Sequence, residues 1–243
     1  MPKNIAREPC PGERGATPAA LAYLANFERL VIRLSGRFIN LVPDQLDRAI
    51  TDALKAIGEF AEVDRSYVFL FSEDAKRVSN THEWCAAGIE PGIDDVQDAP
   101  VDVYSWLLPR LMRGDVVRLP DVASLPRGAN EERGIMQGQG ILSLINLPLI
   151  CAGRTLGFIG FDSVRTRKTW CDAHINLLKV VGEMIAGAIE RVRTTEALRR
   201  QLRLEQLIAD TSSRFINLSG AELDRVSCAA GPGARFAVRF RGR

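Results

Sequence analysis

Two extended runs joined by a short glycine-containing turn constrain the fold of this 243-residue chain more than any other feature. Residues 142–150 and 155–163 are rich in apolar and β-branched side chains, and residues 152–154 (Ala-Gly-Arg) between them are typical of a hairpin turn. A second pair of such runs occupies residues 66–71 and 77–85. Because strands joined by hairpins pair antiparallel, the sequence predicts an antiparallel sheet.

Segments with helical periodicity precede and follow these strands in the sequence. Apolar residues at three- and four-residue steps predict one helix from Ala19 and a second over residues 46–61. Two shorter helices are expected over residues 102–112 and 131–139, and one long helix from Asp172 to about residue 210.

A long loop over residues 88–100 and a short strand over residues 116–119 complete the pattern. The strands are joined by hairpins and the helices are segregated from them. Helices of this kind must cover the faces of the sheet, which predicts an α+β domain over roughly residues 20–190.

The composition excludes several classes of protein. Lys and Arg total 32 against 30 Asp and Glu, so a net charge of +2 favours neither nucleic acid nor an anionic membrane as a partner. No apolar run reaches the length of about 20 residues that a membrane helix needs. Residues 1–18 contain four prolines and no signal-peptide core, and we expect a disordered leader there. These features indicate a cytoplasmic protein.

One segment of the chain occurs twice. Residues 35–48 (SGRFINLVPDQLDR) return as residues 212–225 (SSRFINLSGAELDR), with nine identical positions and a constant offset of 177. This offset matches the length of the domain and its C-terminal helix. We therefore interpret residues 212–225 as the start of a second, incomplete copy of the same module.

The residues after the second copy show neither helical nor strand periodicity. Residues 226–243 (VSCAAGPGARFAVRFRGR) contain four arginines and no acidic residue, which is typical of a disordered basic tail. Two interpretations stay open. The chain is a truncated or frame-shifted fragment of a longer multidomain protein, or the tail is a genuine interaction arm.

Five short sequence segments, in the same order along the chain, resemble those of a known domain family. They are RSYVFLFSED at 65–74, SNTHEWC at 79–85, VVRLPDV at 116–122, GILSLINLPL at 140–149 and GRTLGFIGFDSV at 153–164. On these segments, residues 28–200 resemble a GAF domain of the type that precedes PAS, GGDEF or histidine-kinase modules in bacterial signalling proteins. The resemblance implies a central antiparallel sheet of about five or six strands, a ligand-sized pocket on one face, and terminal helices that pair in a parallel dimer.

The resemblance also implies a domain organisation and a role. The GAF domain would cover residues 19–190, and residues 191–211 would form a coiled-coil linker helix. The implied function is a non-catalytic sensor that binds an unidentified small molecule. It would relay the signal through a homodimeric helix to a missing output domain of kinase or diguanylate cyclase type, as in two-component or cyclic di-GMP signalling.

Two alternatives to a ligand sensor remain at this point. The first is a ligand-free dimerisation scaffold whose pocket is filled by its own side chains. The second is an enzyme similar to the GAF-like reductases of free methionine sulfoxide. Cys85, Cys151 and Cys171 do not match the closely placed cysteines of those enzymes. Neither histidine has a Ser or Cys partner at a catalytic spacing, so no catalytic residue is predicted.

The resemblance leaves the ligand and any cofactor open, because such domains bind cyclic nucleotides, bilins, haem or small metabolites. The Asn-Lys and distal Phe and Asp-Glu pattern of the cyclic-GMP binders is missing. Cys171 and His174 have the wrong position for the Cys-His pair of bilin binders, and Asp172 between them is expected to cap the long helix.

Candidate pocket residues combine apolar walls with a few polar groups, as small-molecule sites do. They are Trp84, Trp106, Met136 and Phe161 with Arg118, Asp121 and Ser143. Each also has a plain structural explanation as a core or turn residue. No metal site is predicted, because alternation along residues 82–85 places His82 and Trp84 on one face of the strand and Glu83 and Cys85 on the other.

The long helix carries the predicted dimer contact. Its apolar residues continue at three- and four-residue steps beyond the length that one domain must cover, which is typical of a helix that needs a partner. The predicted contact residues are Ile185, Ile189, Val192, Leu198 and Leu202.

Overall fold

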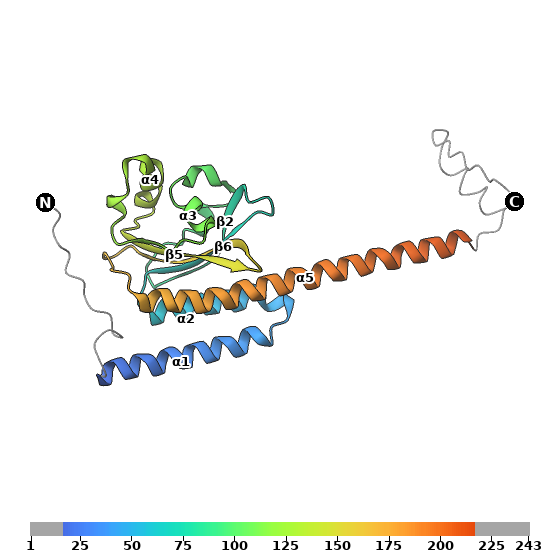
Figure 1. The fold of residues 1–243 in the computed structure, drawn as a ribbon, viewed down its shortest axis with the longest axis horizontal. Helices are drawn as coiled ribbons and strands as arrows, with labels where there is room; N and C mark the ends of the chain where they lie inside the picture. The colour runs from blue at the N-terminus through green and yellow to red at the C-terminus, as the bar shows by residue number, and fades with distance from the viewer. Residues whose placement is uncertain (1–16, 217–243) are drawn as a thin grey trace. The chain divides into compact units, whose positions relative to one another are not determined.

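The computed structural model describes residues 17–216, as a six-stranded sheet with helices on both faces (Figure 1). The strands are β1 (Arg65–Phe71), β2 (Arg77–Cys85), β3 (Ala99–Pro100), β4 (Val117–Leu119), β5 (Ser143–Cys151) and β6 (Arg154–Ser163). The α-helices are α1 (Pro18–Ile39), α2 (Leu46–Phe60), α3 (Leu108–Met112), α4 (Asn130–Gly138) and α5 (Asp172–Ile216). Five 3-10 turns are also described, namely η1 (Pro43–Gln45), η2 (Ile93–Asp95), η3 (Val101–Tyr104), η4 (Val122–Ser124) and η5 (Arg127–Ala129).

The strand order is β3-β2-β1-β6-β5-β4, and every pair is antiparallel. The predicted α+β class and antiparallel sheet are confirmed. Both predicted hairpins form, as β1–β2 and β5–β6. In the second hairpin Ala152 and Gly153 both adopt positive φ angles, 49° and 75°, which is the backbone that a two-residue turn between twisted strands requires.

The helical face of the sheet holds the larger of two apolar clusters. Helix α2 and the first part of α5 pack there against alternate residues of the central strands, and α1 packs on the outer side of α2 (Figure 1). Ile50, Leu54 and Ile57 of α2 are fully buried, and each side chain contributes about 1.5–3 kcal/mol to the free energy of unfolding. The periodicity of α2 therefore reports its packing against the sheet.

The opposite face of the sheet is covered by α3, α4 and the segments that join them (Figure 1). The prediction of a single helix over residues 102–112 is wrong. The structure divides it into η3 and α3, and Pro109 stands at the start of α3. Proline disfavours helical backbone in the residue before it and donates no N–H to the preceding turn, so one continuous helix cannot form there.

Helix α5 is longer than the sequence predicted, and it belongs to two compact units. One unit ends at Val192 and the other begins at Arg193. Two of the predicted dimer residues, Ile185 and Ile189, are 0% and 3% exposed in the core of their own domain. Their assignment to a dimer contact is therefore corrected, because the sheet already covers this turn of the helix.

The remaining predicted dimer residues lie further along α5. Val192 is half-buried, and Leu198 and Leu202 are 56% and 50% exposed. The coiled-coil linker of residues 191–211 stays a prediction. Residues 1–16 of the expected leader, residues 217–225 of the second copy and the tail of residues 226–243 lie outside the described residues.

Two glycines test the packing of the sheet and of α5 separately. A Cβ on Gly157 of β6 would lie 1.9 Å from the carbonyl oxygen of Phe69, whereas a Cβ on Gly187 of α5 would meet no atom of the described residues within 4 Å. Gly157→Ala should lower the free energy of unfolding by several kcal/mol because β1 and β6 must separate. Gly187→Ala should raise it by up to about 1 kcal/mol through helix propensity.

Urea unfolding followed by circular dichroism measures both values. A Gly157→Ala protein as stable as the parent would contradict the close approach of β1 and β6.

Candidate functional site

A cavity of about 60 Å³ lies between the sheet and the cover formed by α3 and α4. Its walls are apolar side chains from both layers, chiefly Phe69, Leu107, Leu108, Ile135, Met136 and Phe158. The rings of Phe69 and Phe158 stack at 4.7 Å on neighbouring strands. Several polar residues of the sheet line the cavity, among them Arg65, Tyr67, Glu83, Asn146 and Asp162, and Tyr104 and Gln139 line it from outside the sheet.

Strand alternation brings these five polar side chains to one face. Arg65 and Tyr67 are two residues apart on β1, so their side chains point the same way. Arg65 pairs with Asp162 of β6, and Tyr67 pairs with Glu83 of β2. With Asn146 of β5, four neighbouring strands thus contribute polar groups.

Gly160 makes room for the centre of this cluster. It stands between Tyr67 of β1 and Asn146 of β5 in the strand register. A Cβ at this position would lie 1.9 Å from Oδ1 of Asn146 and 2.7 Å from Cε2 of Tyr67. Without a side chain at Gly160, the side chains of Tyr67 and Asn146 meet directly across β6.

Tyr67 connects two buried acceptors. Its hydroxyl oxygen lies 2.8 Å from Oδ1 of Asn146 and 2.8 Å from Oδ1 of Asp162. One hydroxyl proton serves only one of these oxygens. The second contact is a hydrogen bond when Asp162 carries a proton, or when the amide of Asn146 turns its NH₂ group to the hydroxyl. The cluster therefore has two proton arrangements with the same heavy-atom positions.

The carboxyl group of Asp162 is poised to change its protonation near neutral pH. Burial raises its pKa to about 7, and the nearby charge of Glu83 adds to the effect. The hydrogen bond from Tyr67 and the positive charge of Arg65 act in the opposite direction, because both favour the carboxylate. Burial also raises the pKa of the Tyr67 phenol, which keeps that hydroxyl a proton donor.

One N–H donor of the Arg65 guanidinium group lacks an acceptor among the described residues. The residue is 6% exposed, and its Nη2 donates to the carbonyl oxygen of Gln139 at 2.7 Å. Its Nε–H is buried and has no hydrogen-bond partner among residues 17–216. A buried donor without an acceptor costs about 1–3 kcal/mol of free energy.

The side of the cavity near Arg65 is ordered by contacts between loops and strands. Glu83 accepts a hydrogen bond from the backbone N–H of Gly92 at 2.8 Å, and Gln139 donates to Asp95 at 3.1 Å. These contacts join the loop after β2 to strand β2 and to the end of α4.

Glu132 of α4 holds the cover of the cavity in place. The residue is 1% exposed, and its Oε1 accepts from the backbone N–H of Trp106 at 2.6 Å and of Leu107 at 3.3 Å. Burial raises the pKa of this carboxyl group, while the two backbone donors oppose the rise. The start of α3 is thereby fastened to α4.

Of the seven predicted pocket residues, the structure places only Met136 in the lining. Trp84 lies on the helical face, where a Cβ on Gly58 of α2 would be 2.4 Å from its ring. Phe161 is fully buried on that same face, 6.4 Å from the ring of Trp170. Both aromatic residues are core residues because their strand positions point away from the cavity.

The other four predicted residues have structural partners. Ser143 accepts from the backbone N–H of Lys168 at 2.9 Å, and Asp121 accepts from that of Ala123 at 2.9 Å. Arg118 forms an exposed ion pair with Asp172 at 3.2 Å. Trp106 lies next to the cavity wall, and its ring stacks under the guanidinium of Arg110 at 4.2 Å.

The sequence reasoning did not assign the polar cluster itself. Its signal was present in the alternation of Arg65, Tyr67 and Phe69, and in the pair Gly160 and Asp162 two residues apart. Which face of each strand meets the cover is decided by tertiary packing, so this alternation alone does not identify a cavity.

The separation of faces predicted for residues 82–85 is seen in the structure. His82 lies on the helical face, with its Nε2 3.2 Å from Asp47, while Glu83 lines the cavity. Among residues 17–216 no group of three or more His, Cys, Asp and Glu side chains is placed to hold a metal ion.

Comparison with known proteins defines the family. The sequence profile of the GAF domain matches residues 45–189, more than half of the chain. The chain belongs to the GAF domain family. Within the described residues of this GAF protein, no helix has both the length and the apolar character that crossing a membrane requires.

One curated relative is the methanogenesis regulatory histidine kinase FilI of Methanothrix harundinacea. It is 29% identical over 190 residues, which cover 76% of this chain and 20% of the kinase. The chain therefore spans about a fifth of the length of that relative.

Solved structures share the fold of this GAF domain. The chromophore-binding domain of an unusual bacteriophytochrome from R. palustris superposes with a TM-score of 0.59 at 15% identity, over 72% of this chain and 63% of that one. The phycocyanobilin-bound GAF domain of a cyanobacterial phytochrome gives a TM-score of 0.57 at 15% identity, over 71% of this chain and 96% of that one.

The buried carboxyl group makes stability depend on pH. Asp162 has a pKa of about 7 in the folded protein against 3.8 for a free side chain, so the folded state holds a proton that the unfolded state releases. Stability contributed by this group falls as the pH rises from about 4 to 7. Asp162→Asn, which cannot ionise, should gain up to about 4 kcal/mol relative to the parent between pH 4 and pH 8.

Urea unfolding of both proteins at several pH values measures this difference. The exposed Asp94→Asn is the control and should show a much smaller change. A constant difference between the Asp162→Asn protein and the parent from pH 4 to pH 8 would rule out a carboxyl group that titrates near 7.

Proposed function

We propose that this GAF domain is a non-catalytic sensory module that binds a compact organic molecule in the cavity, with a carbonyl or carboxyl oxygen of the ligand at Arg65. The observation that carries the proposal is Arg65, a residue of the cavity lining whose buried Nε–H has no acceptor among the described residues. Polar groups at one end and aromatic and aliphatic walls at the other fit a ligand with a polar head and an apolar body.

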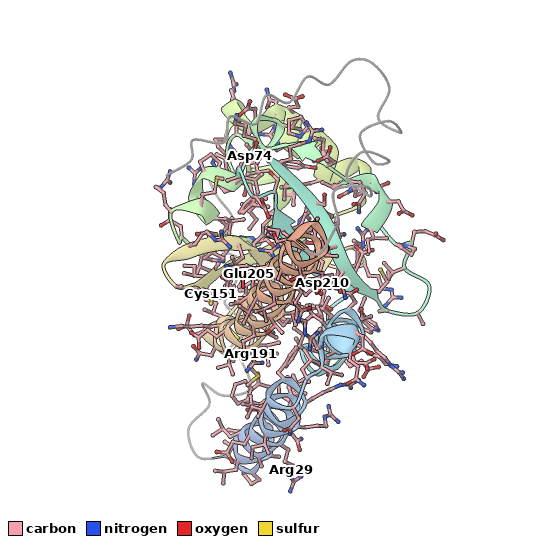
Figure 2. The ribbon with its side chains drawn as sticks, turned by 90° about the vertical axis from the view of Figure 1, so that its right-hand side faces the viewer. Arg29, Asp74, Cys151, Arg191, Glu205 and Asp210 are labelled. Carbon is pink, nitrogen blue, oxygen red and sulfur yellow. The ribbon has the colours of Figure 1, made fainter. Side chains whose placement is uncertain are left out.

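The chemistry of the cavity favours a small ligand. Its volume of about 60 Å³ is well below the roughly 300–1,000 Å³ typical of sites for drug-sized molecules. Bilins are bound by related solved structures, but neither Cys85 nor Cys151, the latter labelled in Figure 2, belongs to the lining. A compact metabolite therefore fits this site better than a covalently attached tetrapyrrole.

The environment of Cys85 supports a non-catalytic role. Burial and the nearby charge of Glu83 raise the pKa of this thiol to about 12. A thiol acts as a nucleophile in its thiolate form, and a pKa this high leaves almost none of it at neutral pH. The reductase alternative therefore gains no support from Cys85.

We further propose that the domain relays ligand binding through α5 to an output domain of kinase or diguanylate cyclase type. One relative of this GAF domain is a regulatory histidine kinase, which supports a kinase output. Ligand binding can bias α5 only by the difference in ligand affinity between two conformations of the domain. Dimerisation of the chain and a cytoplasmic location stay predictions.

A ligand-free scaffold is the second candidate. The small volume of the cavity favours it, because the walls already fill most of the space between sheet and cover. The two candidates differ in whether occupation of the cavity changes the protein, which the following experiment measures.

Stabilisation of the domain by a ligand should depend on Arg65. Benzoate and benzamide combine one apolar ring with a carboxylate or a carbonyl head, and we expect at least one of them to raise the melting temperature of the parent. Arg65→Met should abolish this rise, because the ligand oxygen loses its buried donor. Arg118→Met removes an exposed arginine outside the cavity and should leave the rise unchanged.

Differential scanning fluorimetry with a concentration series of each compound measures the effect, and native mass spectrometry of the purified parent reports any molecule already bound. No shift with either compound and no bound molecule would favour the scaffold.

Formation of the predicted dimer should depend on Leu198 and Leu202. These leucines are exposed on α5, one turn apart, and aspartate at both positions should separate a dimer by placing charges in an apolar contact. Size-exclusion chromatography with light scattering measures the mass of the parent and of the double variant. A parent of monomeric mass at micromolar concentration would remove the dimeric relay.

A further inference from the structure

The second half of α5 carries two apolar faces rather than one. Leu198 and Leu202 are one turn apart, while Leu204, Leu207 and Ile208 lie on a different side. An α-helix turns by about 100° per residue, so Leu198 and Leu202 lie on one side of the helix axis. The mean direction of Leu204, Leu207 and Ile208 around that axis differs from theirs by well over 90°. All five side chains are at least half exposed, between 50% and 65%. A single dimer contact accounts for only one of these faces.

The repeat in the sequence identifies what the second face is for. Residues 212–216 are the final residues of α5, and residues 35–39, their counterparts at the offset of 177, are the final residues of α1. Both copies of the repeated segment thus begin inside the last turn of a helix. The helical part of the repeat in α5 therefore corresponds to the end of α1.

The correspondence extends back through the whole of α1. With the same offset, residues 195–216 align with residues 18–39, and four further positions before the repeat are identical. Ala20 and Leu30, which are buried in α1, correspond to Ala197 and Leu207. Phe27 corresponds to Leu204. Two positions depart from the pattern, since Tyr23 and Leu34 correspond to Arg200 and Thr211.

The described domain shows what covers this face in the first copy. The rings of Tyr23 and Phe27 of α1 lie 5.0 Å and 6.3 Å from that of Phe60 of α2. Leu30 and Phe38 are 5% and 2% exposed in the same cluster as the buried face of α2. The partner of an α1-type face is therefore an α2-type helix.

We propose that residues 195–216 are the α1 of a second GAF module, and that the face of Ala197, Leu204 and Leu207 docks on the α2 helix of that module. Helix α5 is then shared, because its first part belongs to the core of the first domain and its last part to the next. Figure 2 looks along α5 and labels Glu205 and Asp210 on this last part.

In the sequence, the positions that align with α2 do not repeat its apolar face. The buried positions Ile50, Leu54 and Ile57 of α2 correspond to Ser227, Gly231 and Ala234. None of these three residues offers a large apolar side chain. The face formed by Ala197, Leu204 and Leu207 is therefore matched to an α2-type helix from outside residues 1–243.

A helix exchange within the full chain tests the proposal. In the matched graft, residues 19–39 are replaced by residues 196–216, which places Leu207 at position 30 and Phe215 at position 38. In the shifted graft, residues 194–214 are used, and Glu205 and Ser213 occupy those two buried positions. The two inserts have nearly the same composition and helix propensity, so they differ chiefly in which face meets α2.

Thermal unfolding followed by circular dichroism compares the two grafts with the parent. The matched graft should fold with a melting temperature below that of the parent, because Thr211 replaces the buried Leu34. The shifted graft should melt at least about 10 °C below the matched one, because a buried charge replaces a buried leucine. Equal melting temperatures of the two grafts, or failure of both to fold, would overturn the proposal. No ligand is involved, so the outcome is independent of the function proposed for the cavity.

A leucine pair inside the matched graft gives a second readout. Leu207→Asp in the insert occupies the buried position of Leu30 and should lower the melting temperature by about 10 °C. Leu198→Asp in the insert occupies the position of Leu21, which is 58% exposed, and should change it by less than about 2 °C. Equal effects of the two substitutions would show that the insert does not use the α1 face.

Discussion

The pairing of β6 with β1 on one side and β5 on the other is the constraint on which the rest of this domain depends. A Cβ at Gly157 or Gly160 would lie within 2 Å of atoms on these neighbouring strands, so the strands approach more closely than larger residues in β6 would permit. The same strands supply the alternate residues that bury α2 and α5 on one face and form the cavity on the other. The helical core and the candidate site are thus two sides of one sheet.

The cavity is a place where the fold tolerates unfavourable electrostatics. Asp162 is buried with a pKa near neutrality, and the Nε–H of Arg65 has no acceptor among the described residues. Each of these costs free energy in the folded domain, and a purely structural sheet would be more stable with apolar residues at both positions. In the proposed sensor, a ligand oxygen at Arg65 and a proton on Asp162 would both reduce this cost, so binding and protonation would be coupled.

Helix α5 connects this chemistry to the rest of the chain. Its first part is held by the core through residues such as Ile185, and its last part presents leucines on two separate faces. A dimer through Leu198 and Leu202 and a second module on Leu204 and Leu207 use different sides of the helix, so the two contacts are compatible. The repeat of residues 35–48 gives this arrangement a register, because it fixes which residue of α5 corresponds to each residue of α1.

The sequence by itself determined the α+β class, both hairpins, the long C-terminal helix and the family. These features depend on local periodicity and turn chemistry, which neighbouring residues encode. Only the tertiary structure decided which strand face meets the helices and which meets the cover. Trp84 and Phe161 therefore proved to be core residues, while Arg65, Tyr67 and Asp162 line the cavity. Alternation places side chains on two faces, but the packing of distant segments such as α3 and α4 decides which face encloses a site.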